Sequence, residues 1–221
     1  MEGRGWASCP VRERRSRDGG RTWGVERYLR RGWGLMVRNE PVAWHDRLLM
    51  PMYDERDWTS FVLISEDGGN SWRASDRLRA DAGIIQPALA ELPGGRLLML
   101  LRSRGGFIYR ALSEDGERWS APEATGLPNP NSALELIRLA SGALLAVYNP
   151  GARARTPLRV ALSHDGERWD VWRDLESEPG EYSYPTATQT SDSVLHVLYT
   201  WRRQTIAHAA FDEAWLQAAH H

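Results

Sequence analysis

Hydrophobic residues in this chain come in short runs that turn residues separate. In the clearest unit, which begins at Ile84, the runs IIQPALAEL, RLLMLLRS and FIYRALS are separated by PGG and RGG. Similar units begin near residues 37, 132 and 184. Short apolar or alternating runs bounded by glycine and proline are typical of β-strands. Only the final DEAWLQAA has a helical spacing. The pattern therefore predicts an all-β protein built from repeated units of strands.

A motif rich in serine, acid, glycine and tryptophan closes four of these strand groups. It occurs at residues 16–23, 65–72, 113–119 and 163–169. Its leading serines lie 49, 48 and 50 residues apart. This period is typical of a β-propeller, in which each repeat is a blade of four antiparallel strands. We therefore expect four blades, preceded by a half blade at residues 1–33 with only a third and a fourth strand. Such a chain would be part of a larger, six-bladed ring; the alternative is a compact four-bladed ring with an extra strand pair.

The motif has the composition of a structural turn between the third and fourth strands of a blade. Its glycines adopt positive φ at little cost, and its aspartate can accept hydrogen bonds from turn amides. Its tryptophan can bury a large ring against the blade. We therefore expect every motif aspartate to bind a turn amide and Trp23, Trp72, Trp119 and Trp169 to be mostly buried. The spacing of the acids does not match a calcium-binding EF-hand loop.

Composition excludes several classes of function. The formal net charge of -1 gives no global field that would attract nucleic acid or a membrane surface. The single cysteine excludes an internal disulfide framework, and no apolar run has the length of a membrane span. No signal peptide is visible, so the compartment of the protein stays open. No nucleotide motif or metal-ligand spacing indicates a cofactor or metal, and His196 and His208 are not spaced as ligands.

The repeated motif, S-x-D-G-G-x-[TS]-W, resembles the Asp-box, or BNR repeat, of the sialidase (neuraminidase) family. The segments between the boxes add to the resemblance, above all IIQPALAELPGGRLLMLLRS, TPLRVALSHDGERW and GEYSYPTATQTSDSVLHVLYT. It covers residues 12–212 and matches the C-terminal two thirds of a six-bladed sialidase. It implies that residues 1–221 form one propeller domain that is incomplete at its N-terminus.

The resemblance also implies a site. The family binds the carboxylate of sialic acid with three arginines, for which the planar guanidinium is well suited. It uses a tyrosine nucleophile with a carboxylate that takes its proton, and an aspartate as acid/base. By position, Arg102 matches the second arginine, Arg155 the third, with Arg153 as its competitor, and Tyr182 the nucleophile. Gln86 stands at the position of the carboxylate and cannot take a proton as a carboxylate does. The first arginine and the acid/base aspartate would belong to blades that precede this sequence.

Propeller geometry places these residues together. The starts of first strands and the loops between second and third strands share one face, and the boxes lie on the opposite face. Arg102 and Arg155 fall in such loops, whereas Gln86 and Tyr182 fall at first-strand starts. Equivalent positions add weaker candidates for substrate binding, namely Arg38, Asn131 and Tyr184. Glu40 occupies a further equivalent position in the preceding blade.

These observations favour a sialidase-like glycoside hydrolase domain that acts on an acidic glycan or a sialoside. Gln86 favours two alternatives, which are a non-catalytic glycan-binding propeller and a propeller lyase or glycosidase acting on uronic acids. We expect little or no sialidase activity from this sequence by itself. Because an open ring exposes strand edges, we also expect possible self-association.

Overall fold

The computed structural model describes residues 6–218, and within them nearly all regular structure is β-strand. After a short 3-10 helix, η1 (Trp6–Ser8), β1 (Val11–Glu13) pairs with β2 (Arg27–Arg30) as a two-stranded sheet. The chain ends in a short helix, α1 (Glu213–Gln217), whose N-cap Asp212 accepts a hydrogen bond from the amide of Trp215. None of the helices within residues 6–218 is long and apolar enough to cross a membrane.

Four larger antiparallel sheets follow the first hairpin in chain order. The first contains β3 (Leu35–Val37), β4 (Val42–Trp44), β5 (Arg47–Asp54), β6 (Thr59–Ser65) and β7 (Arg73–Ala74). The second contains β8 (Ile84–Glu91), β9 (Leu97–Ser103), β10 (Phe107–Ser113) and β11 (Glu123–Pro128). The third contains β12 (Glu135–Arg138), β13 (Leu144–Tyr148), β14 (Leu158–Ser163) and β15 (Val171–Glu176). The fourth contains β16 (Tyr182–Gln189), β17 (Leu195–Trp201) and β18 (Thr205–Phe211).

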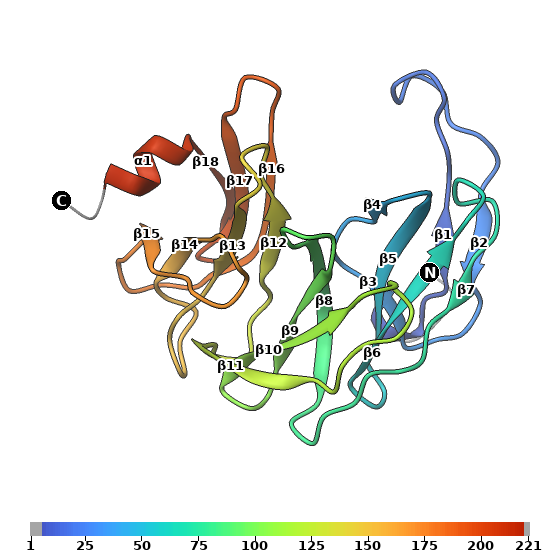
Figure 1. Cartoon of the computed structure of the whole chain (residues 1–221), viewed down its shortest axis with the longest axis horizontal. Helices are drawn as coiled ribbons and strands as arrows, with labels where there is room; N and C mark the ends of the chain where they lie inside the picture. Colours follow the sequence, from blue (N-terminus) through green and yellow to red (C-terminus); the bar gives the residue numbers. More distant parts are fainter. Residues whose placement is uncertain (1–5, 219–221) are drawn as a thin grey trace.

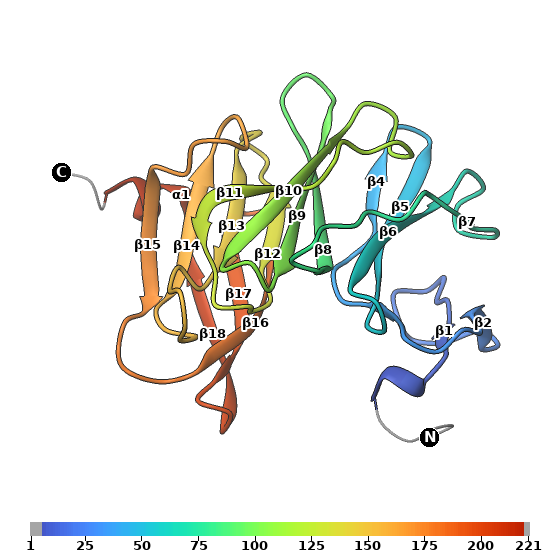
Figure 2. The ribbon, with the colours of Figure 1, turned by 90° about the horizontal axis from the view of Figure 1, so that it is seen from below.

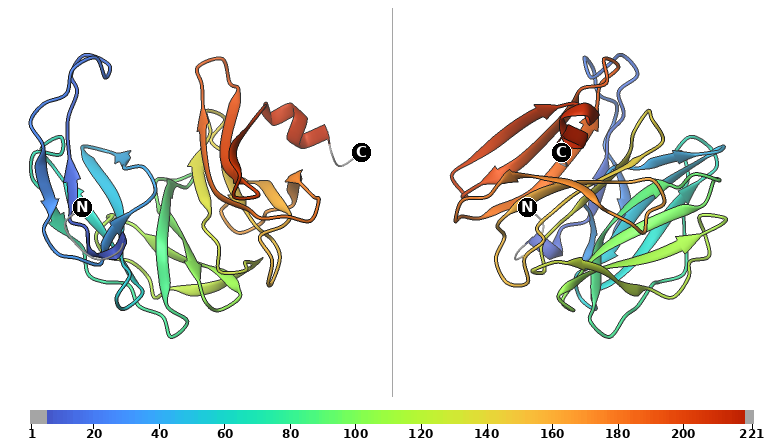
Figure 3. Two further views of the ribbon diagram at one scale, coloured as in Figure 1. Left: turned by 180° about the vertical axis from the view of Figure 1, so that it is seen from behind. Right: turned by 60° about the vertical axis from the view of Figure 1, so that its left-hand side comes forward.

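The sheets stand side by side along an open arc. In Figure 1 the β1–β2 hairpin lies at one end of the arc, and β16 to β18 lie with α1 at the other end. The view from below shows the hairpin and the first two large sheets in the same order, with β16 to β18 partly behind β12 to β15 (Figure 2), and the views in Figure 3 show how the sheets are inclined to one another. The fold is a propeller of four blades, named blades 1 to 4 in chain order, with the β1–β2 hairpin as a half blade. The predicted fold class is confirmed.

The hydrophobic core is divided into layers between successive sheets. On β9, Leu97, Met99 and Leu101 pack toward blade 1, whereas Leu98 and Leu100 pack toward blade 3. Successive side chains of a strand point to opposite faces, so a strand that is covered on both faces needs apolar residues at every position. This explains the unbroken run LLMLL in the sequence. On β17 of blade 4, Leu195 and Val197 belong to the core, and alternate residues face outward.

The first strands of blades 1, 2 and 4 are interrupted near the same end. Register shifts interrupt β8 between Ile85 and Ala88 and β16 between Ser183 and Thr186. In blade 1 the interruption is complete, and β3 and β4 pair separately with β5. Bulges of this kind redirect side chains and are common beside functional sites. Here they aim the residues at these positions toward the propeller axis.

The Asp-box turns form as expected. Ser65 accepts a hydrogen bond from the amide of Gly69 at 2.7 Å, and Asp67 accepts one from the amide of Ser71 at 2.8 Å. The aspartates of the other three boxes also accept turn amides, so that part of the prediction is confirmed. Hydrogen bonds within its own turn lower the pKa of Asp67 to about 2, and the largest contribution comes from the hydroxyl of Ser71.

The prediction for the box tryptophans is correct only in part. Trp169 is 8% exposed within the core between blades 2 and 3, and Trp72 and Trp119 are partly buried against neighbouring layers. Trp23 is 61% exposed. The half blade has only two strands, so the ring of Trp23 has no full sheet on which to pack; its indole N–H donates to the carbonyl of Gly20.

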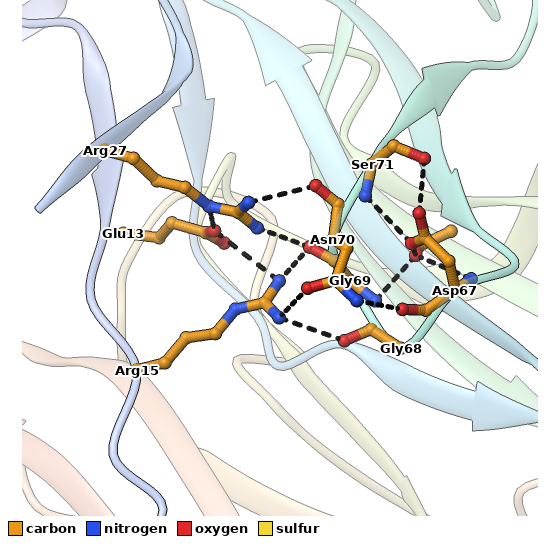
Figure 4. A network of polar contacts seen from close by, with 9 residues as sticks. Glu13, Arg15, Arg27, Asp67, Gly68, Gly69, Asn70 and Ser71 are labelled. Atoms are coloured by element: carbon orange, nitrogen blue, oxygen red, sulfur yellow. Dashed lines mark hydrogen bonds and ion pairs between the residues drawn. The ribbon is translucent and has the colours of Figure 1, made fainter. Parts of the chain in front are cut away.

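Two arginines of the half blade bind the box turn of blade 1, at residues 65–72 (Figure 4). Arg15 donates to the carbonyls of Gly68 and Gly69 and to the side chain of Asn70 at 2.9 Å. Arg27 donates to the carbonyls of Gly69 and Asn70, and it also pairs with Glu13. A Cβ atom at Gly69 would lie 2.9 Å from the guanidinium of Arg15, so glycine allows this close approach. These hydrogen bonds attach the half blade to blade 1.

The two ends of the arc carry exposed apolar side chains. At the N-terminal end these are Trp23, Val25 and Trp33, and on blade 4 they are Leu198 and Ile206. Self-association through these ends stays a prediction.

Candidate functional site

The predicted site residues lie at the end of the blades opposite the box turns. In blade 2, Arg102 at the end of β9 pairs with Ile85 at the start of β8, whereas Ser113, which begins a box, pairs with Leu97 at the other end of β9. We call the end with Arg102 the arginine face. It consists of the starts of β8 and β16 and of the loops after β5, β9, β13 and β17.

Arg102 is the centre of the arginine face. Its Nε donates to Oδ1 of Asn131 at 2.7 Å, and its Nη1 donates to Oε1 of Gln86 at 3.1 Å. Both partners are neutral, and among residues 6–218 no carboxylate lies within ion-pair distance of Arg102. Burial lowers the pKa of this guanidinium, and Tyr184 opposes part of the shift. Arg102 is thus a partly buried positive charge that has no ion-pair contact with a carboxylate among the described residues.

Gln86 and Asn131 are held by unusual backbone geometry. Both lie in the left-handed region, with φ of 54° and 56°. The conformation is rare outside glycine and costs energy, and residues that adopt it are frequent at functional sites. Gln86 is buried, and its amide nitrogen approaches the hydroxyl of Tyr53 at 3.5 Å. Burial raises the pKa of Tyr53. The predicted grouping of Arg102 with Gln86 and Asn131 is present in the structure.

Arg155 reaches the arginine face from the loop between β13 and β14. Its Nη1 pairs with Glu181 at 3.1 Å, and its guanidinium lies 5.6 Å from the centroid of the Tyr184 ring. Arg203 pairs with the same carboxylate at 2.5 Å and is the main cause of the lowered pKa of Glu181. Two guanidinium groups therefore share one carboxylate. Arg153, the competing candidate, is exposed.

Of the two tyrosines that the sequence suggested for the site, Tyr184 is exposed beside the arginines, whereas the side chain of Tyr182 is buried. Tyr182 is 0% exposed and belongs to the core between blades 3 and 4, where its hydroxyl accepts a long hydrogen bond from Arg202 at 3.3 Å. Its amide donates to the carbonyl of Arg155, but its side chain is buried, so its expected exposure to a substrate is wrong. Tyr184, at φ 52°, is 49% exposed and lies near Arg102 and Arg155. The register explains the difference, because Tyr184 rather than Tyr182 occupies the bulge position of Gln86.

Arg38 crosses the propeller axis. Its guanidinium donates to the side chain of Asn39, to the carbonyl of Leu134 in blade 3 and to the carbonyl of Pro185 in blade 4. Burial lowers the pKa of Arg38, and the buried carboxyl of Glu135 opposes the shift. The bonds of Arg38 thus join blades, and we assign it a structural part in the site. Glu40 lines a cavity of about 330 Å³ between the first strands, together with Glu135.

Two further residues on the arginine face, Trp58 and Arg104, escaped the sequence analysis. Trp58 follows β5, and the guanidinium of Arg104 stacks 3.5 Å from its ring centroid. Glu55 lies in the same loop; burial raises the pKa of its carboxyl, and Arg102 and Arg104 oppose this shift. Chain position could have indicated this part of the site, because Glu55 and Trp58 lie in the loop of blade 1 that corresponds to the Arg102 loop of blade 2.

Histidines and acids in the described residues form no group suited to a metal ion. His196 and His208 stack on neighbouring strands of blade 4, with Nδ1 of the first 2.9 Å from Nε2 of the second.

Comparison with solved structures identifies the class of fold. The NanB sialidase of Streptococcus pneumoniae matches with a TM-score of 0.79 and 18% identity, over 91% of this chain and 35% of that chain. The intramolecular trans-sialidase of Ruminococcus gnavus matches with a TM-score of 0.76 and 21% identity, over 92% of this chain and 50% of that chain. A protein of unknown function from Dyadobacter fermentans gives 0.75 and 22% identity, over 89% of this chain and 62% of that chain. The protein is therefore a sialidase-like β-propeller.

The sequence places the chain more narrowly. Residues 1–197 match the BNR repeat-like domain, and the chain belongs to that family. No curated protein sequence gives a significant match. The chain spans less than two thirds of the length of each of the three solved structures. At these identities the likeness establishes the fold, and the chemistry must be argued from the site.

Proposed function

We propose that the arginine face binds the carboxylate of an acidic sugar such as sialic acid, as part of a sialidase-like glycoside hydrolase domain. The observation that carries this proposal is the environment of Arg102. A guanidinium that is partly buried without a counter-ion is costly, and an incoming carboxylate would offset that cost. Gln86 and Asn131 fix the orientation of Arg102 through neutral acceptors and leave its positive charge in place.

The neighbouring groups suit an acidic sugar. Arg155 and Arg203 share the single carboxylate of Glu181, which leaves a net positive charge beside Tyr184. The exposed ring of Tyr184 offers an apolar face and a hydroxyl to a bound sugar. Uronic acids present the same carboxylate, so a lyase or glycosidase acting on uronic acids uses the same recognition and is a second candidate.

Hydrolysis requires a group that takes the proton of the tyrosine, since a phenol with a pKa near ~10 is a poor nucleophile at neutral pH. The amide of Gln86 cannot do this, and its oxygen already accepts from Arg102. Gln86 therefore favours binding with slow or no turnover, the function of a non-catalytic glycan-binding propeller. We propose that Tyr184, rather than Tyr182, contacts the sugar.

A binding experiment tests the carboxylate site. N-acetylneuraminic acid, its C1 methyl ester and galacturonic acid are titrated against the protein and against Arg102→Ala, with Arg153→Ala as the matched control. Losing a charged hydrogen bond costs about 1.5–3 kcal/mol, so we expect Arg102→Ala to weaken binding of the acids roughly tenfold or more. Binding of the ester should change little. Equal losses for the acid and its ester would contradict the proposal. An aryl sialoside assay, in which we expect little hydrolysis, separates binding from turnover.

A further inference from the structure

Arg104 and Trp58 form a contact beside Arg102 that the proposed function does not use. Arg104 follows β9 directly, two residues after Arg102, and its guanidinium stacks on the indole of Trp58 at 3.5 Å. Arg102 lies 5.7 Å from the same ring. Two arginines thus approach one tryptophan on the arginine face.

The chain holds Trp58 firmly in an unfavourable conformation. Its φ is 52°, which is an outlier for a bulky residue. Its carbonyl accepts the amide of Ile84 at 2.9 Å, so the loop of blade 1 is fixed to the start of β8. Gly83 lies against the side chain, and a Cβ atom there would be 3.0 Å from Cβ of Trp58. Strain that the surrounding structure maintains in this way indicates a functional constraint.

Stacking leaves the hydrogen-bonding edge of Arg104 available. A guanidinium that lies flat on an aromatic ring keeps its in-plane N–H donors free for a carboxylate or sulfate. Arg104 is exposed, and within residues 6–218 no carboxylate is close enough to form an ion pair with it. Gly106, two residues further on, faces open space, because a Cβ atom there would contact nothing within 4 Å, whereas Gly105 packs against Ala82 and Tyr109.

The charges on this side of the face do not balance. Among the described groups, Glu55 is the carboxylate whose field acts on both Arg102 and Arg104. One carboxylate cannot neutralise two guanidinium groups, so this part of the face keeps a net positive charge until an anionic group binds.

We propose that Arg104, stacked on Trp58, forms a second anion-binding subsite for a negatively charged group on the sugar that adjoins the one bound by Arg102. The ligand is then an acidic oligosaccharide with charges on neighbouring residues. This inference rests on the proposed function, because Arg102 must bind the first acidic sugar. Trp58 acts as a positioning residue that presents the guanidinium edge.

Matched ligands that differ only in the second charge provide the test. Sialyllactose has a neutral sugar next to its sialic acid, whereas α2,8-linked disialic acid has a carboxylate there and sialyllactose sulfated on galactose has a sulfate. We expect the two dianionic ligands to bind about tenfold more tightly than sialyllactose at low salt. A gain with disialic acid alone would identify a carboxylate subsite, and a gain with the sulfated ligand alone would identify a sulfate subsite.

Variants test whether Arg104 and Trp58 cause the tighter binding of the dianionic ligands. Arg104→Ala should remove the tenfold preference while leaving the affinity for sialyllactose unchanged, and Arg153→Ala, another exposed arginine of this face, should retain it. Arg104→Lys keeps the charge without the planar fork and should retain only part of the preference. Trp58→Phe keeps an aromatic face and should reduce it less than Trp58→Leu.

The outcomes separate this inference from the proposed function. If sialyllactose binds through Arg102 and the dianionic ligands bind no better, the subsite is wrong and the proposed function stands. A preference that survives Arg104→Ala also overturns the subsite. If none of the ligands binds, both proposals fail.

Discussion

Asp54 ties together the loop that carries Glu55 and Trp58, and its replacement by asparagine should destabilise the protein in a pH-dependent way. Its carboxylate accepts hydrogen bonds from Arg56 at 2.9 and 2.6 Å and from Arg77 at 3.0 Å, and the side chain is 1% exposed. Asn has the same shape and no charge, so Asp54→Asn removes the charge with little change in packing.

The pKa of Asp54 gives the magnitude. Hydrogen bonding to Arg56 is the main reason that this pKa falls from 3.8 to about 2. One pKa unit corresponds to about 1.4 kcal/mol, so the full shift is worth roughly 2.5 kcal/mol of unfolding free energy. Arg56 is half exposed and water screens the pair, which lowers the expected loss to about 1–2 kcal/mol at pH 7.

The sign of the pH dependence follows from the lowered pKa. A carboxyl with a depressed folded pKa stabilises the protein above its unfolded pKa and loses this contribution as the pH falls through its folded value. The difference in unfolding free energy between the protein and Asp54→Asn should therefore be constant above pH ~5 and shrink between pH ~4 and 2.

Urea denaturation at pH 7, 4 and 2.5 measures this difference. The pKa values of the box aspartates are also lowered by hydrogen bonds, but these aspartates are present in both proteins and their contributions cancel. Asp46→Asn, at an exposed turn, is the control and should change little at any pH. A loss that is the same at pH 7 and pH 2.5 would show that charge is not the cause and would refute the reasoning.

Three further predictions concern the site and the boxes. Tyr184→Phe should weaken binding of an acidic sugar, measured by NMR titration, whereas Tyr182→Phe should leave binding unchanged and lower stability by about 0.5–1.5 kcal/mol; the reverse pattern would restore Tyr182 to the site. Gln86→Glu should place a carboxylate against Arg102 and reduce affinity for N-acetylneuraminic acid by calorimetry; a rise in affinity would contradict this expectation, and the appearance of hydrolysis would show that a carboxylate at this position acts as a base. Trp169→Ala should cost about 3–5 kcal/mol in urea denaturation and Trp23→Ala under about 1 kcal/mol, because only the first is buried; similar losses would contradict this difference.

The sequence was sufficient for the fold because periodicity and local turn chemistry determine it. The spacing of the boxes predicts the number and length of the blades. Each box aspartate accepts hydrogen bonds from amides within four residues of itself. It also placed Arg102, Gln86 and Asn131 together, since equivalent positions of neighbouring blades meet near the axis. The half blade shows the limit of this reasoning, because burial of Trp23 depends on neighbouring sheets and not on the motif.

The tyrosines show a second limit. Tyr182 and Tyr184 are two residues apart and would share one side of a regular strand. The bulge at Tyr184 breaks that alternation, and neither residue type nor spacing reveals on which side of a bulge a tyrosine lies. Trp58 and Arg104 were missed for a related reason, because their contact joins loops of two blades across the surface.

The bonds of Arg38 have a mechanical consequence. Each blade of a repeat protein contacts mainly its neighbours, so small rotations at successive interfaces accumulate along the array. Arg38 instead spans a chord, from the first strand of blade 1 to main-chain oxygens of blades 3 and 4. Such a tie restrains blade 1 relative to blades 3 and 4, in addition to the core layers between successive blades. Arg38 therefore couples the position of blade 1 to the positions of the blades on the opposite side of the site.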